Sequence, residues 1–445
     1  MYLPQNILSC ISRLEEAGYP CYAVGGCVRD AHLGLTPADY DLCTAATPEE
    51  MEALFSDHRL ILAGKKHGTV GVLTQDGVVE ITTFRTEGDY DDNRHPNWVR
   101  FVDDIRQDLA RRDFTVNAMA YSPTRGFCDP FGGRADLERK LLRAVGHPET
   151  RFREDSLRIL RGLRFSVRYQ LQPEEATEKA MVALAPLMDN LARERVFDEL
   201  CKLIPLVNAQ DLGRFAPILA QVIPELGPMI GFDQRSPHHA YDVFTHTAHV
   251  VANTPGDLTL RWAALLHDVG KVPSFTTDET GRGHFYGHAQ KSAEMADRIL
   301  LRLKAPNALR EQVVQLIDLH MTKLSPEKKV LRRWLSRLGQ DTLEKLLTLQ
   351  KADTSSKGIC KEEELQQIAA LQACFDAVLA EETCLSIADL TVNGRDLLEM
   401  GLAGPAIGQV LQSLLEQIMD EQLPNQREAL LHAAKDLILS QEVPQ

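Results

Sequence analysis

The hydrophobic pattern of this chain changes character once along its length. Through about residue 125, short apolar runs of strand type alternate with amphipathic helical segments. From Arg153 onward, apolar residues recur almost throughout with the 3.6-residue spacing of a helix, most clearly over 153–168 and 192–206. The change predicts an α+β N-terminal domain, with a small mixed sheet and helices, followed by an all-α remainder.

Local signals refine this division. A helix is expected over 7–17, a strand over 21–24, and a hairpin over 69–73 and 78–83, joined by an Asp76-Gly77 turn. Gly227-Pro228 and Ser236-Pro237 punctuate the helical part. The domains are predicted to span 1–125, 126–235, 236–360 and 361–445.

Composition places the chain among soluble proteins. Of 445 residues, 44% are hydrophobic and 25% are charged, and no apolar run is long enough to span a bilayer. The N-terminus lacks the pattern of a signal peptide, and the nine cysteines are scattered as reduced thiols would be, so a cytoplasmic location without a membrane partner is expected.

The net charge of −14 argues against a broad nucleic-acid surface. The segment from residue 100 to 168, however, contains fifteen Arg and Lys residues and only ten Asp and Glu residues. This imbalance predicts a local basic surface that can hold one end of an RNA.

A glycine pair ends the first predicted strand, in Ala23-Val24-Gly25-Gly26. Glycine permits a close approach of backbone to a phosphate, and a helix beginning near Val28 would direct its free N–H groups at that anion. Taken alone, the pair equally fits an ordinary strand–helix turn. No Gly-x-x-x-x-Gly-Lys-Ser/Thr stands anywhere in the chain, so a P-loop is excluded.

Two carboxylates follow the glycines at a spacing of two residues, Asp39 and Asp41. In an extended segment both would point to the same face, where they can hold Mg²⁺. Glu80, on the second strand of the predicted hairpin, is a candidate third carboxylate that can face either a site or solvent. A metal pair held there can activate a 3′ hydroxyl and stabilise a leaving pyrophosphate.

Five sequence blocks in this order resemble the class II tRNA nucleotidyltransferase and bacterial poly(A) polymerase family. They begin at the glycine pair and at Asp39 and continue with the blocks 111–119 (RRDFTVNAM), 154–158 (EDSLR) and 193–200 (RERVFDEL). The resemblance implies a nucleotidyltransferase head, a helical neck that selects the base, and a helical body and tail that hold tRNA.

These blocks contain residues that could recognise a base, because an ionised Asp only accepts hydrogen bonds and an Arg only donates them. On a continuous helix over 153–168, Asp155 and Arg158 would share one face and satisfy cytosine or adenine, but not uracil or guanine. The resemblance likewise implies selection of CTP and ATP by this pair. The predicted nucleotide-binding residues are Gly25, Gly26, Arg29, Arg112, Asp113, Asn117, Asp155, Arg158, Arg161 and Arg164.

The polar, acid-rich segment 85–96 is predicted to be a mobile loop. It resembles the flexible loop with which such enzymes switch from C to A addition, which argues against an enzyme that adds only C.

A second constellation lies in the helical part. Adjacent His267 and Asp268 end an apolar helical segment, and further His and Asp residues flank them. The set resembles the metal site of HD-domain phosphohydrolases, including two-metal ones, and would suit Mn²⁺, Ni²⁺ or Co²⁺. Its predicted ligands are His246, His267, Asp268, His288, His320 and Asp353.

The sequence thus favours an enzyme that adds C, C and A to tRNA from CTP and ATP, with Mg²⁺ at the head. Three alternatives remain open: a poly(A) polymerase or an enzyme adding only C or only A, an HD phosphohydrolase with a nucleotide-binding head, and a non-catalytic RNA-binding protein. The sequence does not decide between a monomer and a dimer.

Overall fold

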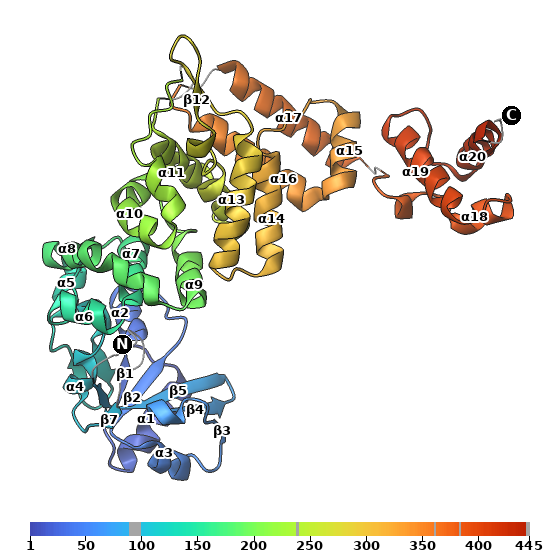
Figure 1. Ribbon diagram of the computed structural model, residues 1–445. Helices are drawn as coiled ribbons and strands as arrows, with labels where there is room; N and C mark the ends of the chain where they lie inside the picture. Colours follow the sequence, from blue (N-terminus) through green and yellow to red (C-terminus); the bar gives the residue numbers. More distant parts are fainter. Residues whose placement is uncertain (89–98, 237–239, 360–361, 382–383, 442–445) are drawn as a thin grey trace. The chain divides into compact units, whose positions relative to one another are not determined.

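A computed structural model describes residues 1–88, 99–236, 240–359, 362–381 and 384–441 (Figure 1). The chain forms two compact units. The first comprises 1–207, 214–227 and 302–304, and the second comprises 208–213, 228–301 and 305–445. The finer division into four domains stays a prediction.

A seven-stranded mixed sheet forms the core of the first unit, in the order β3-β4-β5-β2-β1-β8-β9. Strands β2 and β5 pair in parallel and the other pairs are antiparallel. The predicted hairpin is confirmed as β4 and β5. The strands are β1 Cys21–Val24, β2 Asp41–Thr44, β3 Arg59–Ile61, β4 Thr69–Thr74, β5 Gly77–Thr83, β8 Ala120–Ser122 and β9 Gly126–Cys128.

A smaller ribbon joins β6 Arg85–Glu87 to β7 Val99–Phe101. The predicted mobile loop therefore starts as a strand, and its residues 89–96 lie outside the described residues.

Helices connect and flank these strands, as the blue to green part of Figure 1 shows. The predicted helix over 7–17 is confirmed as α1, and that over 192–206 as α9. The helices of the head are α1 Gln5–Glu16, α2 Gly26–His32, α3 Pro48–Leu54, η1 Lys65–His67, α4 Ile105–Ala110 and η2 Thr115–Asn117. Those that follow the sheet are α5 Gly133–Glu138, α6 Pro148–Glu154, α7 Leu157–Tyr169, α8 Glu175–Leu184, η3 Ala185–Asn190, α9 Arg193–Leu203, α10 Ala209–Val222 and η4 Pro224–Met229, with the short pair β10 Leu141–Leu142 and β11 Gln172–Pro173.

The single helix predicted over 153–168 is wrong. Helix α6 ends at Glu154 and α7 starts at Leu157, with Asp155 between them in an extended conformation (φ −144°, ψ 102°). The side chain of Asp155 accepts a hydrogen bond from the Leu157 N–H, two residues ahead, at 3.1 Å. A local hydrogen bond from side chain to backbone competes with helix continuation, and hydrophobic periodicity does not register that competition.

Within its described residues, the second unit is helical apart from one small hairpin, which confirms the predicted change of class. Its elements are α11 Val243–Asn253, α12 Leu258–Leu266, η5 Val272–Ser274, β12 Thr276–Thr277, β13 Gly283–His284, α13 His288–Arg302, α14 Asn307–Leu319, α15 Lys328–Leu338, α16 Gln340–Ser355, α17 Glu362–Ala380, η6 Ile387–Asp389, α18 Gly394–Glu399, α19 Pro405–Met419 and α20 Arg427–Gln441. Among the described residues, no helix combines the length and the apolar character needed to cross a membrane.

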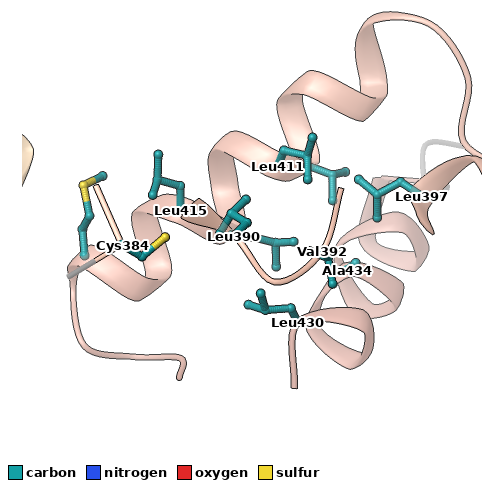
Figure 2. Packing of buried hydrophobic residues seen from close by; sticks show 11 residues of the cluster. Cys384, Leu390, Val392, Leu397, Leu411, Leu415, Leu430 and Ala434 are labelled. Carbon is teal, nitrogen blue, oxygen red and sulfur yellow. The ribbon is translucent and has the colours of Figure 1, made fainter. Parts of the chain in front are cut away.

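The C-terminal helices of this unit enclose a hydrophobic cluster of their own. Figure 2 shows side chains from α18, α19 and α20 directed toward one another, together with Leu390 and Val392 from the segment before α18. Leu397, Leu414 and Leu430 are fully buried in this cluster. Burial of such side chains is the main force that holds these short helices together.

Candidate active site

Three predicted carboxylates share one cleft in the sheet domain. Parallel pairing of β2 with β5 sets Leu42 opposite Ile81, which places Asp41 beside Glu80 at the same end of the two strands. Asp39 precedes β2, and all three acids line a cleft of about 490 Å³. Glu80 therefore lines the cleft, whereas the sequence left open whether it faces a site or solvent.

The charges in this cleft repel one another. Burial, together with the neighbouring carboxylates of Asp39 and Glu80, raises the pKa of Asp41, although Arg112 opposes the shift. Gathering ionised acids in a partly desolvated cleft is unfavourable unless a cation joins them. The arrangement is that of a divalent-cation site, with oxygen ligands of the kind Mg²⁺ prefers.

The glycine turn beside the cleft is shaped around Arg112. Gly25 adopts a left-handed φ of +73°, and a Cβ on it would lie 2.6 Å from Nη1 of Arg112. Helix α2 begins directly after it, at Gly26, two residues earlier than predicted. Nε of Arg112 is buried without a hydrogen-bond partner among the described residues. The turn thus combines a close backbone approach with a guanidinium, which suits a phosphate.

Four predicted nucleotide-binding residues form one hydrogen-bonded chain. Arg29 donates to Oδ1 of Asn117, whose Nδ2 donates to Oδ1 of Asp113 at 3.0 Å. Arg161 of α7 donates through Nε to Oδ2 of Asp113 at 2.8 Å. Burial opposes ionisation of Asp113, but the charge of Arg161 and the Asn117 hydrogen bond outweigh it and lower the pKa of Asp113 to about 2. This chain links α2 to α7 through fixed charges.

Tyr169 belongs to the same network but was not expected from the sequence. Nη2 of Arg29 donates to the Tyr169 hydroxyl at 2.5 Å, and the guanidinium lies 4.2 Å from the centre of the tyrosine ring. A single Tyr at the end of an amphipathic helix carries no signal of such a role, because its partner lies 140 positions earlier.

The two predicted base-selecting residues have separate partners within the protein. Oδ2 of Asp155 accepts from Nη2 of Arg195 at 2.9 Å. Arg158 instead donates to Glu154 at 2.7 Å and to the backbone carbonyl of Arg111 at 2.9 Å. Because the helix breaks at Asp155, the two residues do not occupy successive turns of one helix as the prediction assumed.

Arg164 of α7 forms a buried ion pair with Glu199 of α9. The sequence predicts that Arg164 binds the nucleotide, whereas its partner in the structure is this acidic side chain.

A second cluster lies in the helical unit and contains all six predicted HD-type ligands. His246 stands on α11, His267 and Asp268 follow α12, His288 begins α13, His320 follows α14 and Asp353 stands on α16. Potential ligand atoms of His246, His267 and Asp268 lie within 4.8 Å of one another, and so do those of Asp268, His288 and His320. Asp268 therefore belongs to both groups.

Hydrogen bonds orient the imidazoles of this cluster. Nδ1 lies within hydrogen-bond distance of a backbone carbonyl in each case: that of Ala264 for His267 (2.8 Å), Phe285 for His288 (2.8 Å) and Ile317 for His320 (2.6 Å). A proton on Nδ1 leaves Nε2 as the lone-pair nitrogen directed inward, as metal ligation requires. Nε2 of His288 is buried without a hydrogen-bond partner among the described residues.

The electrostatics of the cluster centre on the Asp268 carboxylate. Burial opposes ionisation of Asp268, but His267 and Lys271 outweigh it and hold its pKa well below the usual range. Burial and the charge of His267 lower the pKa of His320 to about 4. Burial alone would also lower the pKa of His267, but the Asp268 carboxylate raises it instead. An ionised Asp that draws protons toward its neighbours can equally draw a divalent cation.

Comparison with known proteins agrees with the geometry of the head. Residues 21–143 match the family model described as Poly A polymerase head domain, residues 170–211 that of the Probable RNA and SrmB-binding site of polymerase A, and residues 274–434 that of tRNA nucleotidyltransferase domain 2. The carboxylate cleft and the matched head domain define a nucleotidyltransferase.

Similar proteins show which family of nucleotidyltransferases the chain belongs to. The CCA-adding enzyme of Bacillus velezensis is 32% identical over 430 residues, covering 94% of this chain and 95% of that protein. That of Streptococcus pyogenes serotype M3 is 34% identical, covering 95% and 94%. The chain belongs to the CCA-adding enzyme family of template-independent nucleotidyltransferases, and the predicted family is confirmed.

Solved structures agree with the fold. The crystal structure of the Bacillus stearothermophilus CCA-adding enzyme in complex with CTP aligns with a TM-score of 0.72, at 27% identity over 99% of both chains. The Thermotoga maritima CCA-adding enzyme complexed with tRNA_CCA aligns with a TM-score of 0.63 at 19% identity, over 98% of this chain and 96% of that one, a likeness of fold. The nucleotidyltransferase fold also indicates dependence on a divalent metal.

Proposed function

We propose that this chain adds C, C and A to the 3′ end of tRNA, using CTP and ATP, at the cleft formed by Asp39, Asp41 and Glu80. The convergence of these three carboxylates on one cleft carries the assignment. The relatives named as CCA-adding enzymes, and their solved forms with CTP and with tRNA, support the substrates.

Asp39 and Asp41 would hold Mg²⁺ in this cleft, with Glu80 beside them. The shared cleft supports this role, and so does the raised pKa of Asp41, because burial and the Asp39 carboxylate outweigh the opposing charge of Arg112. When bound, the metal would supply activation of the 3′ hydroxyl and stabilisation of the departing pyrophosphate.

Arg112 and the Gly25-Gly26 turn would receive the triphosphate. The unpaired Nε of Arg112 and the close approach to Gly25 support this role. Arg29, Asp113, Asn117 and Arg161 form a preorganised chain, in which each side chain is held by its neighbour before a nucleotide arrives.

Asp155 and Arg158 would select the base. An ionised Asp can accept a hydrogen bond from the amino group that cytosine and adenine share. Uracil and guanine present a carbonyl at that position, which cannot donate one. Unpaired polar groups cost roughly 1–3 kcal/mol each, which is the scale of the discrimination expected. Arg164, by contrast, would act by holding α7 to α9 through Glu199.

The test supplies a tRNA that ends at its discriminator base, with Mg²⁺ and each labelled nucleotide alone and together. Addition that stops after C-C-A supports the proposal, whereas a long A tail or no incorporation refutes it. Asp41→Asn should abolish incorporation. Asp103→Asn, which changes an exposed carboxylate outside the cleft, should leave incorporation intact.

A second candidate function rests on the six-residue cluster. We propose that His246, His267, Asp268, His288, His320 and Asp353 bind one or two divalent ions, with Mn²⁺, Ni²⁺ and Co²⁺ as the candidates. The observation in favour is the buried, unpartnered Nε2 of His288, with Oδ1 of Asp268 3.6 Å away, too far for a hydrogen bond between them. Such a centre would supply a metal-activated water for phosphoester hydrolysis.

Metal analysis of the purified protein tests the second candidate. His246→Gln should lower the metal content after supplementation, whereas His249→Gln, one turn along the same helix and stacked on Tyr241, should not. Absence of bound metal from the supplemented wild-type protein would refute the site. Hydrolysis of a generic phosphodiester by the loaded protein, lost in His246→Gln, would assign the activity.

A further inference from the structure

Asp155 contacts Arg195, a residue outside the predicted nucleotide-binding set. Arg195 comes from α9, forty residues after Asp155, and its Nη2 donates to Oδ2 of Asp155 at 2.9 Å. The other carboxylate oxygen, Oδ1, accepts from the backbone N–H of Leu157 at 3.1 Å. One local and one long-range hydrogen bond therefore fix both oxygens of this carboxylate.

The local hydrogen bond alone would not fix the carboxylate. Asp155 lies between α6 and α7 in an extended conformation, and its backbone hydrogen bonds to Arg151 and Arg158 hold the main chain but not the carboxylate. The terminal torsion of an Asp side chain is broad. With only the Leu157 N–H as an anchor, the second oxygen would be free to swing. The Arg195 guanidinium removes that freedom and keeps a positive charge against the ionised form.

Helix stability does not explain why an Arg stands at position 195. Arg193 and Arg195 both occupy the first turn of α9, where the helix dipole disfavours a positive charge. Moreover, Nη1 of Arg195 is buried without a partner among the described residues, a costly state for a charged group. Both features oppose stability, so the residue is better explained by what its other nitrogen holds.

The same face of α9 contacts α7 one turn later. Glu199, four residues after Arg195, forms the buried pair with Arg164. Residues four apart share one face of a helix. The Glu199 pair therefore fixes the distance and rotation of α9 against α7, and thereby sets where Arg195 reaches the beginning of α7.

We infer that Arg195 is a positioning residue for base selection: it holds the Asp155 carboxylate in the orientation that accepts a hydrogen bond from the amino group of cytosine and adenine. The inference rests on the proposed base-selecting role of Asp155. Arg195 itself acts through Asp155 and does not read the base.

Single-nucleotide incorporation kinetics test this inference, with CTP and UTP compared on a tRNA that ends at the discriminator base. Arg195→Gln should lower the ratio of kcat/KM for CTP to that for UTP by at least about tenfold, since it removes a charge-assisted hydrogen bond to Asp155. Arg195→Lys keeps a charged donor and should restore most of the ratio. Arg193→Gln removes a charge from the same turn, where it faces Asp189, and should leave the ratio unchanged.

The outcomes distinguish failure of the role of Arg195 from failure of the base-selecting role of Asp155. Asp155→Asn, whose amide can donate to a carbonyl, should admit UTP, and an unchanged ratio there would overturn the base-selecting role of Asp155. If Asp155→Asn relaxes the ratio and Arg195→Gln does not, the inference alone fails. Equal loss of CTP and UTP use in Arg195→Gln marks a structural role for Arg195 and also overturns the inference.

Discussion

The buried pair of Arg164 and Glu199 offers the sharpest test of how the neck helices hold together. Only 11% of the Arg164 side chain and 5% of the Glu199 side chain are exposed. Glu199→Leu would leave the guanidinium buried without its partner, a change that costs about 3–5 kcal/mol. For a domain of this size, each kcal/mol corresponds to about 2–4 °C in Tm, so we expect a fall of about 6–20 °C.

Thermal unfolding followed by circular dichroism measures this effect. The double variant Arg164→Met/Glu199→Leu removes both charges together and should recover most of the loss, because a well-packed apolar pair often replaces a buried ion pair without penalty. Glu175→Ala is the matched control. It breaks the exposed pair with Lys179 on α8, where 82% of the Glu175 side chain is exposed, and should not shift Tm measurably.

Two results would refute this reasoning. If Glu199→Leu shifts Tm by less than about 2 °C, the guanidinium is not confined in a dry environment. If the double variant falls as far as the single one, lost packing and not an unpaired charge explains the effect. CTP addition by a stable double variant would further show that Arg164 does not contact the nucleotide.

Three further predictions concern the head. Asp113 has a pKa of about 2, below its unfolded value near 3.8, so its ionised form contributes about 2 kcal/mol to the free energy of unfolding above pH 4, and this contribution is lost between about pH 4 and 2. Unfolding in denaturant at pH 7 and at pH 2 should therefore show a smaller difference for Asp113→Asn than for the wild type. The raised pKa of Asp41 means that ionisation destabilises the metal-free fold at pH 7, so Asp41→Asn should raise Tm in EDTA while abolishing incorporation, and an unchanged Tm would contradict this sign. Gly25→Ala, with a Cβ 2.6 Å from Arg112 Nη1 and an unfavourable φ of +73°, should raise KM for CTP at least tenfold, and a wild-type KM would remove the turn from the triphosphate site.

Much of the head was predictable because its signals are local. Alternating apolar residues around an Asp-Gly turn encode a hairpin, and two carboxylates two positions apart encode a shared face, wherever the rest of the chain goes. The sequence therefore predicted β4 and β5 correctly, and Asp39 and Asp41 line one cleft in the structure. The six candidate ligands of the second cluster also lie close together in the structure, and their binding of a metal stays a prediction.

Partner choice was not predictable from the same signals. The periodicity over 153–168 is genuinely helical, yet the extended backbone at Asp155 divides the segment into two helices. Its carboxylate then meets Arg195, and Arg164 meets Glu199, both contacts between side chains that lie 35 to 40 residues apart in the sequence. Charged side chains pair with the groups that helix packing brings near them, and the spacing of residues along the sequence does not predict how helices pack.

By itself, the sequence determined the class of each region and the chemical identity of the groups in the site, because backbone periodicity and side-chain ionisation are properties of short segments. Only the tertiary structure decided which way Glu80 points, which guanidinium holds Asp155, and that Tyr169 supports Arg29. These are outcomes of parallel strand register and helix contact, which bring distant residues within hydrogen-bond range. Residue types set what the site can do, whereas packing sets which residues do it.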